Sequence, residues 1–259
     1  MTTVEYFPYT RQVKEEYETE NGVKHGLHTT YYASGATKTI STYVRGVLTG
    51  IVRKFYREGK IRSMKTYADD GVAEGPYVMK YDNSQTYTSY ENVRGEIDGL
   101  FAQYYRNGNP LKRAMYSYGK RDGMTYEYYP DGTLKMRGRY ENGKKVDDHY
   151  EYYQNGRAKT LNRYDDGMKD GECKTYYENG QISTLVTYRR GRYDGRTIYY
   201  YRDGSVRGEC TYGPNGKIVG RYDRYDTCGG RTSTYYDPAG SGRVIGRKRF
   251  DELMSADGA

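Results

Sequence analysis

The chain has no tryptophan and only four phenylalanines among its 259 residues. Leu, Ile, Val and Phe together supply 34 residues, well below the share that an ordinary globular core uses. No apolar stretch approaches the ~20 residues that a membrane-spanning helix needs. The composition therefore excludes a thick aliphatic interior, and taken alone it would favour disorder.

Cysteines are also few, and the chain shows no targeting signal. Cys173, Cys210 and Cys228 form an odd set without CxxC spacing, so neither a disulfide framework nor a zinc site is predicted. Reduced thiols indicate a reducing compartment. The start MTTVEYFPYT lacks the basic-then-apolar pattern of a signal peptide. The sequence therefore predicts an intracellular, cytoplasmic protein.

Tyrosine is abundant instead, with 36 residues that fall at fixed positions. A Gly–x₄–Tyr–Tyr–x₂–Gly unit recurs with a period of 24 residues, once 25, and begins at Gly26, Gly50, Gly75, Gly99, Gly123, Gly171 and Gly195. Asp147 occupies the anchor position of the sixth unit. A fixed period of this length is typical of an array of supersecondary units and argues against disorder.

Each repeat is predicted to be a β-hairpin. Its first strand leads from the anchor to the tyrosine pair, and a short turn such as PDG at 130–132 or ENG at 178–180 follows. The second strand ends at another tyrosine, for example Tyr43 or Tyr188, before a second glycine turn. The fold class is therefore all-β, an elongated single twisted antiparallel sheet of consecutive β-hairpin repeats.

The type of the short turn decides the strand register. Pro130 favours a three-residue loop with Gly132 at a bulge, whereas Asn-Gly would also suit a two-residue loop. The three-residue register pairs the following residues: Phe55 with Ile61, Tyr128 with Leu134, Tyr176 with Ile182, Tyr200 with Val206, Glu127 with Lys135, and Glu151 with Lys159. The two-residue alternative would shift every pair by one residue.

In the three-residue register, one face carries the first tyrosine of each pair, the aliphatic residues and the strand-ending tyrosines, and we expect it to be the buried face. The opposite face carries the second tyrosines together with basic residues such as Lys38 and Arg62. Such an array could form cation–π contacts and bind a partner, or the basic residues could simply keep the sheet soluble. The partner-binding candidates are Tyr129, Tyr153, Tyr177, Tyr201, Lys135, Lys159 and Arg207.

The repeat also defines the organisation of the chain. We expect an N-terminal cap or half-repeat over 1–22, eight repeats over 23–216, irregular C-terminal repeats over 217–250, and a tail over 251–259. In the irregular part, Gly230 with Tyr235-Tyr236 is interpreted as a restart of the pattern. Irregular ends are expected because terminal units must cap open strand edges.

The segments TYYENGQISTLVTYRRGRYDG and EYYPDGTLKMRGRYENGKKVD resemble the variant form of MORN repeats (membrane occupation and recognition nexus). The resemblance covers roughly residues 20–250. It implies consecutive antiparallel hairpins in one extended sheet. Because variant MORN repeats occur in antitoxin-like proteins and in proteins of large DNA viruses, it implies an antitoxin-like or a viral structural, capsid-associated role. A virion location would follow in the viral case.

No motif for catalysis is present: the chain lacks GxxxxGK[ST], HExxH and GxSxG. His28 and His149 occupy a position that holds Val52 or Cys173 in other repeats, so a structural role is expected. We therefore predict a non-enzymatic scaffold without cofactor, metal or small-molecule substrate, which binds protein partners. The alternative is a binder of anionic ligands, namely phospholipid headgroups or nucleic acid, through the Tyr/Lys/Arg face.

Overall fold

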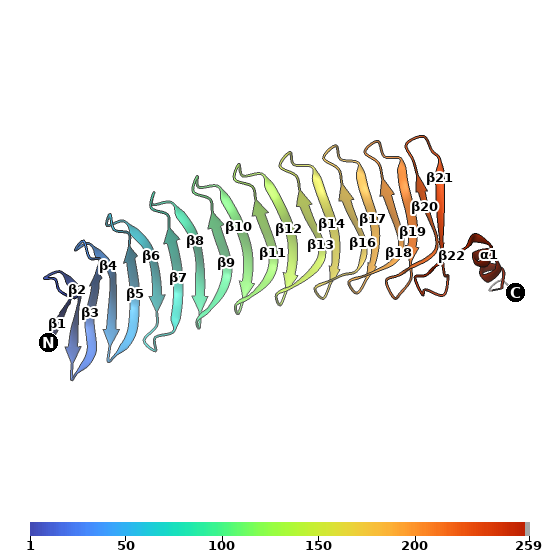
Figure 1. Ribbon diagram of the computed structural model, residues 1–259. Coiled ribbons are helices and arrows are strands. Elements are labelled where there is room, and N and C mark those ends of the chain that lie inside the picture. The colour runs from blue at the N-terminus through green and yellow to red at the C-terminus, as the bar shows by residue number, and fades with distance from the viewer. Residues whose placement is uncertain (257–259) are drawn as a thin grey trace. The chain divides into compact units, whose positions relative to one another are not determined.

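A computed structural model describes residues 1–256 of the chain, which divides into two compact units, Met1–Gly132 and Thr133 onward. Within each unit the strands lie side by side in chain order and pair antiparallel with their neighbours (Figure 1). Consecutive hairpins of an all-β antiparallel sheet are thus confirmed. Unit 1 contains β1 (Thr2–Tyr6), β2 (Val13–Glu20), β3 (Val23–Tyr31), β4 (Thr37–Val44), β5 (Val47–Phe55), β6 (Ile61–Tyr67), β7 (Ala73–Lys80), β8 (Thr86–Val93), β9 (Glu96–Tyr104), β10 (Pro110–Ser117) and β11 (Lys120–Tyr128).

Unit 2 continues with the same hairpin pattern and ends in the chain's one described helix. Its elements are β12 (Leu134–Glu141), β13 (Lys144–Tyr152), β14 (Ala158–Asp165), β15 (Met168–Lys169), β16 (Gly171–Tyr176), β17 (Ile182–Arg189), β18 (Arg192–Tyr200), β19 (Val206–Tyr212), β20 (Ile218–Tyr225), β21 (Arg231–Tyr236), β22 (Val244–Ile245) and α1 (Arg247–Ala256). Phe250 of α1 packs on Tyr235 of β21 with 5.2 Å between ring centroids. The helix therefore includes residues 251–256 of the predicted tail. Residues 257–259 lie outside the part of the chain that the structure describes.

The three-residue turn is confirmed. In β3–β4 the amide of Tyr32 donates to the Ala36 carbonyl oxygen at 2.8 Å, and Gly35 has a φ of +86°. The expected pairs Phe55–Ile61, Tyr176–Ile182 and Tyr200–Val206 all form. The pairs Tyr128–Leu134 and Glu127–Lys135 join different units and stay predictions.

A β-bulge directly after each of these turns was not predicted. Tyr152 opposes Ala158, but Glu151 opposes Thr160, so Lys159 is the extra residue. The predicted Glu151–Lys159 pair is therefore wrong. Lys38 and Arg207 occupy the same bulged position, between Thr37 and Thr39 and between Val206 and Gly208. The bulge inserts one residue and reverses the facing of everything beyond it.

This reversal places the first tyrosine of each pair and the strand-ending tyrosines on opposite faces, although they were expected to share one face. Tyr43 lies 5.7 Å from the His28 ring, and Tyr140 and Tyr164 lie 5.2 and 4.9 Å from His149. The strand-ending tyrosines thus flank the residues that stand two positions after each anchor. Since side chains alternate along a strand, the first tyrosine of each pair points to the other face. We call the face of His28 and His149 the core face and the other the open face.

Many of the most buried residues lie on the core face. Cys173 opposes Val186, and Thr197 opposes Cys210; all four are buried. The face expected to be buried carries Phe55, Tyr128, Leu134, Tyr176, Ile182 and Tyr200, and these residues are only half-buried. The deepest packing is therefore on the face opposite to the one predicted, because the bulge moves the strand-ending tyrosines there.

The anchor residue of every repeat needs a left-handed backbone. All seven anchor glycines have positive φ, and Asp147 adopts +60° at the equivalent place. Gly220 joins this series with a φ of +72°, and Tyr225 follows five residues later. The repeat therefore continues from Gly220, and the interpretation of Gly230 as the restart is wrong. The irregularity before Gly220 is a longer loop at residues 213–217. A similar loop lies at residues 68–72, whereas most repeats have a two-residue turn at this place.

Candidate binding surfaces

The second tyrosine of each pair links one repeat to the next. The Tyr153 hydroxyl donates to the Tyr176 carbonyl oxygen at 2.7 Å, Tyr177 donates to Tyr200 at 2.7 Å, and Tyr201 donates to Tyr225 at 2.8 Å. The same bond is made in unit 1 by Tyr32, Tyr56, Tyr81 and Tyr105. We call these seven residues the tyrosine ladder. The ladder also includes the repeat in which Lys80 replaces the first tyrosine. There the Tyr56 hydroxyl donates to the backbone oxygen of Lys80, which any residue would supply.

Cationic side chains lie over several of these rings. Lys38 lies 6.0 Å from the Tyr32 ring centroid and Lys159 lies 5.9 Å from that of Tyr153, so cation–π contacts of the kind considered for this array are present. Arg207, however, lies 5.7 Å from the Tyr199 centroid, so it does not extend this pattern onto Tyr201. Each exposed contact of this kind contributes ~0.5–1 kcal/mol.

The ladder tyrosines among the predicted partner-binding residues are half-buried and already hydrogen-bonded. Tyr129 is half-buried too and belongs to unit 1, whereas Lys135 and Lys159 are exposed in unit 2. The structure thus gives Tyr153, Tyr177 and Tyr201 a structural task, and it does not test whether a partner also contacts them.

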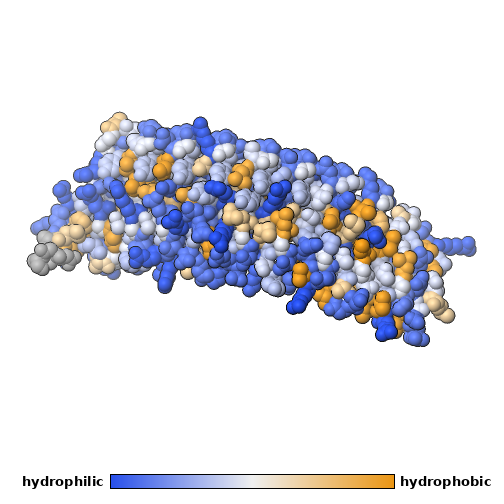
Figure 2. Space-filling model, turned by 180° about the vertical axis from the view of Figure 1, so that it is seen from behind, coloured by the Kyte–Doolittle hydropathy of each residue, from blue (hydrophilic) through white to orange (hydrophobic). Residues whose placement is uncertain are grey.

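A row of exposed apolar side chains crosses the open face of unit 1. Leu27 on β3, Ile51 on β5 and Leu100 on β9 are 49%, 43% and 53% exposed, and Met115 on β10 is 41% exposed. Leu100 and Met115 oppose each other directly, and Leu27 and Ile51 oppose Thr42 and Thr66. Exposed apolar side chains of unit 1 appear orange at the right of Figure 2. We call these four residues the apolar row.

The same positions in unit 2 carry charges. Asp148 opposes Arg163, and the Asp148 Oδ1–Arg163 Nε distance is 2.9 Å. In β18, Arg196 pairs with Glu209 of β19 at 2.6 Å. Each unit therefore presents its own surface chemistry on the open face, apolar in unit 1 and ion-paired in unit 2.

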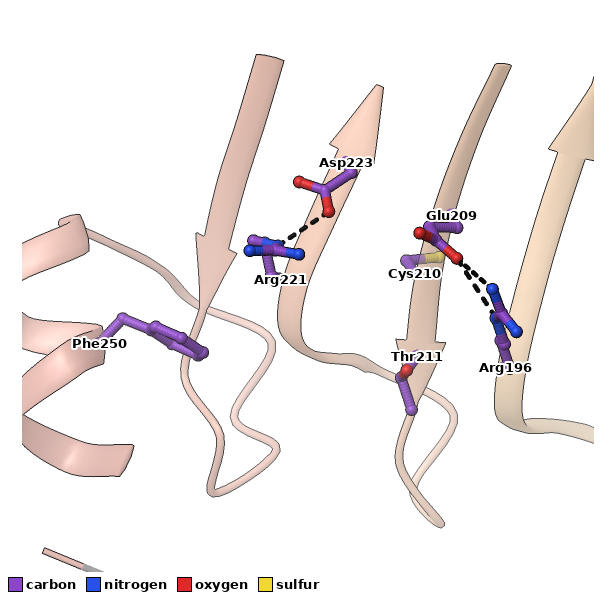
Figure 3. A pocket seen from close by; sticks show the side chains of 7 residues that line it. All are labelled: Arg196, Glu209, Cys210, Thr211, Arg221, Asp223 and Phe250. Carbon is purple, nitrogen blue, oxygen red and sulfur yellow. Dashed lines mark hydrogen bonds and ion pairs between the residues drawn. The ribbon is translucent and has the colours of Figure 1, made fainter. Parts of the chain in front are cut away.

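The open face of unit 2 also has a cavity of about 340 Å³ next to α1 (Figure 3). Arg196 and Glu209 form one ion pair at its wall, and Arg221 Nε and Asp223 Oδ2 form another at 2.8 Å. Phe250 approaches from the helix. Burial raises the pKa of the Cys210 thiol, so a reactive thiolate is disfavoured there. Because its charges are already paired, this cavity offers no free charge to a ligand.

The two repeat histidines have structural settings, as expected. His28 is buried between Tyr17 and Tyr43, and its Nε2 lies 2.8 Å from Glu15 Oε2. His149 is buried, and its Nε2 lies 2.8 Å from the Arg139 carbonyl oxygen. Within residues 1–256, no cluster of three or more His, Cys, Asp or Glu side chains could hold a metal ion. Across that same range, no helix is long and apolar enough to span a bilayer.

The sequence did contain a signal for the apolar row that was missed. The residue directly after the anchor is apolar in the first five repeats, namely Leu27, Ile51, Pro76, Leu100 and Met124. In the later repeats it is charged, namely Asp148, Glu172, Arg196 and Arg221. The pattern differs between repeats rather than within one, so a search for the shared motif passes over it.

These features define a repeat protein built as an open antiparallel sheet of hairpins. Four segments, residues 48–69, 121–144, 169–190 and 193–213, match the family described as MORN repeat variant. The predicted resemblance is thus confirmed for the repeat type, and MORN repeats are suggestive of a scaffold or binding role. No curated protein matches the chain.

Comparison with solved structures gives only remote similarities. The chain is 11% identical to the Photorhabdus luminescens Tc holotoxin pore, with a TM-score of 0.20, covering 92% of this chain and 16% of that one. A porin-like protein from Bacteroides uniformis is 11% identical, with a TM-score of 0.20, 90% of this chain covered and 92% of that one. A TcdB2-TccC3-Cdc42 structure gives 10% identity and a TM-score of 0.21, over 90% of this chain and 14% of that one.

Proposed function

We propose that the protein is a non-enzymatic, intracellular repeat scaffold that binds a protein partner through the apolar row of unit 1. The observation that supports this proposal is the exposure of Leu27, Ile51 and Leu100 at equivalent places on one sheet face, with Met115 exposed directly opposite Leu100. Exposed apolar side chains in a repeating row are costly in water and mark surfaces that bind other proteins. No cofactor, metal or small substrate enters this function.

The tyrosine ladder supports the scaffold part of the proposal. Each of its bonds joins a side chain to the backbone of the next repeat, for example Tyr56 to Lys80 at 2.7 Å. Such bonds hold neighbouring hairpins in register, so little order remains to be imposed when a partner binds. A pre-organised surface loses less conformational entropy on association.

Two settings are proposed for the partner. In one, the protein is antitoxin-like and neutralises the partner by covering its working surface. In the other, it is a structural, capsid-associated component of a large DNA virus and resides in the virion. The two differ in stoichiometry, since an antitoxin forms a discrete complex and a capsid component forms an extended assembly.

The test uses a matched pair of surface variants. The protein is captured with its partner from its own cells, and the partner is identified, purified and titrated. An Ile51→Lys, Leu100→Lys variant should stay folded, because single exposed substitutions change stability by about 0.5 kcal/mol or less. It should lose at least about tenfold in affinity, as expected for apolar residues at a binding centre.

The control places the same charges on the same face of unit 2, as Thr187→Lys, Thr211→Lys, and should leave the affinity unchanged. Equal losses in both variants would assign the effect to net charge. Binding that instead falls steeply with salt and is reproduced by nucleic acid or by vesicles containing acidic phospholipid would favour the anionic-ligand alternative.

A further inference from the structure

The core face of unit 2 contains a second cavity, of about 280 Å³, between β18, β19 and β20. Rings of Tyr199 and Tyr222 line it, Gly208 lies between them, and Arg207 and Arg224 stand at its rim. Gly208 opposes Tyr199 on one side and Arg224 on the other. The cavity is thus built from three adjacent strands and belongs to one place in the array.

The cavity is lined by a glycine, Gly208, where other repeats have a side chain. Gly208 is buried, and its φ is not in the left-handed region, so the glycine is needed for space rather than for backbone conformation. A Cβ atom there would lie 3.3 Å from Cε2 of Tyr222 and 2.9 Å from the Asp223 carbonyl oxygen. The equivalent positions hold Thr39, Ser63, Thr88, Lys112, Met136, Thr160 and Thr184. Tyr222 and the Asp223 backbone therefore approach the second strand more closely here than a side chain would allow, and this close approach is particular to this repeat.

The aromatic side chain of Tyr199 also distinguishes this repeat from the two before it. Tyr199 stands four residues after its anchor, where the preceding repeats carry Thr175 and Glu151. Burial raises the pKa of its hydroxyl. The Tyr201 hydroxyl donates to the Tyr225 carbonyl oxygen at 2.8 Å and fixes the rim. The walls are thus ordered before any ligand arrives.

The two arginines at the rim are not neutralised. The Arg207 guanidinium carbon lies 5.7 Å from the Tyr199 ring centroid, and that of Arg224 lies 4.8 Å from Tyr222. In the part of the chain that the structure describes, neither has an ion pair with a carboxylate, whereas Arg196 and Arg221 on the open face both do. Two unpaired guanidinium groups over aromatic rings are a typical arrangement for binding an oxyanion.

We propose that this cavity binds a small aryl anion, a single aromatic ring that carries a carboxylate or phosphate. The flat ring packs against Tyr199 and Tyr222, and the oxyanion accepts hydrogen bonds from Arg207 and Arg224. The volume, about 280 Å³, lies just below the ~300–1,000 Å³ that is usual for small-molecule sites, which suits one ring with a charged group. The site is independent of the apolar row.

Isothermal titration calorimetry with phenyl phosphate and benzoate tests the proposal. Saturable binding of at least one of them is expected, at least about tenfold tighter than inorganic phosphate or phenol, because each of the latter offers only one of the two contacts. An Arg207→Gln, Arg224→Gln variant should lose at least about tenfold in affinity. Both residues are exposed, so the variant should fold normally.

The matched control is Arg202→Gln, which removes an arginine 5.7 Å from the Tyr177 ring centroid but outside the cavity. Its affinity for the aryl anion should equal that of the unmodified protein. A second variant, Gly208→Ala, should weaken binding by displacing Tyr222 and the Asp223 backbone, with folding checked by circular dichroism. Absence of saturable binding to either aryl anion overturns the proposal, as does unchanged affinity in the double Gln variant.

Discussion

The Tyr177 hydroxyl donates a hydrogen bond of 2.7 Å to the Tyr200 carbonyl oxygen, which lies 23 residues further along the chain. One side chain of each repeat thereby contacts the backbone of the next repeat at the same atom. In a repeat array, stability is largely the sum of terms within repeats and between neighbours. The hydrogen bonds of the tyrosine ladder contribute to the part of the stability that arises between neighbouring repeats.

Loss of one ladder bond should be measurable. Tyr177→Phe keeps the ring and removes only the hydroxyl, so the free energy of unfolding should fall by about 1 kcal/mol, the usual net value of a hydrogen bond. The control is Tyr118→Phe, whose side chain is 74% exposed and should change nothing. Urea unfolding followed by circular dichroism gives both values, and equal midpoints would remove the ladder from the stability argument.

The anchor glycines should be sensitive to any Cβ atom. At Gly50 the φ is +67° and no atom lies within 4 Å of a built Cβ, so only backbone strain acts. Gly50→Ala should therefore lower the free energy of unfolding by about 1–2 kcal/mol. Gly50→Asn should cost less, because asparagine tolerates this conformation better, as Asp147 does at +60°. Thermal unfolding of both variants checks this order, and equal costs would contradict it.

The pair of Glu15 and His28 should make unit 1 acid-sensitive. Burial alone would raise the pKa of Glu15, but hydrogen bonds from His28 and Lys14 and the charge of Lys24 lower it below its ordinary 4.5. A carboxylate with a lowered pKa stabilises the fold above its unfolded pKa, and this contribution is lost as the pH falls through the folded value. The stability difference between the unmodified protein and Glu15→Gln should therefore shrink below about pH 4.5. A difference that stays constant from pH 7 to pH 3 would show that the ion pair does not contribute.

The three thiols should differ in reactivity. Burial raises the pKa of Cys173 and Cys210, which lowers their thiolate fraction and also blocks access, whereas Cys228 is exposed in a turn. Alkylation of the native protein followed by mass spectrometry should label Cys228 first, and the other two should react only on unfolding. Early labelling of Cys210 would show that the strands around it open readily.

The period of 24 residues, the two strands of each repeat and the three-residue turn could all be read from the sequence. Those features are local: glycine at a positive φ and proline before Asp-Gly restrict only their own neighbours in the chain.

The sequence could not decide which face holds the core, and the tertiary structure did. The bulge at Lys159 and its equivalents adds one residue between paired strands, and a shift of one residue moves each following side chain to the other face. That shift places Tyr164 beside His149 rather than beside the first tyrosines. The cavity lined by Gly208 likewise needs three strands side by side, because Tyr199, Gly208 and Tyr222 come from three successive strands. The conformation of a turn depends on neighbouring residues in the chain and can be predicted from them. The face on which a side chain lies, and the cavities between strands, depend on how successive strands pair.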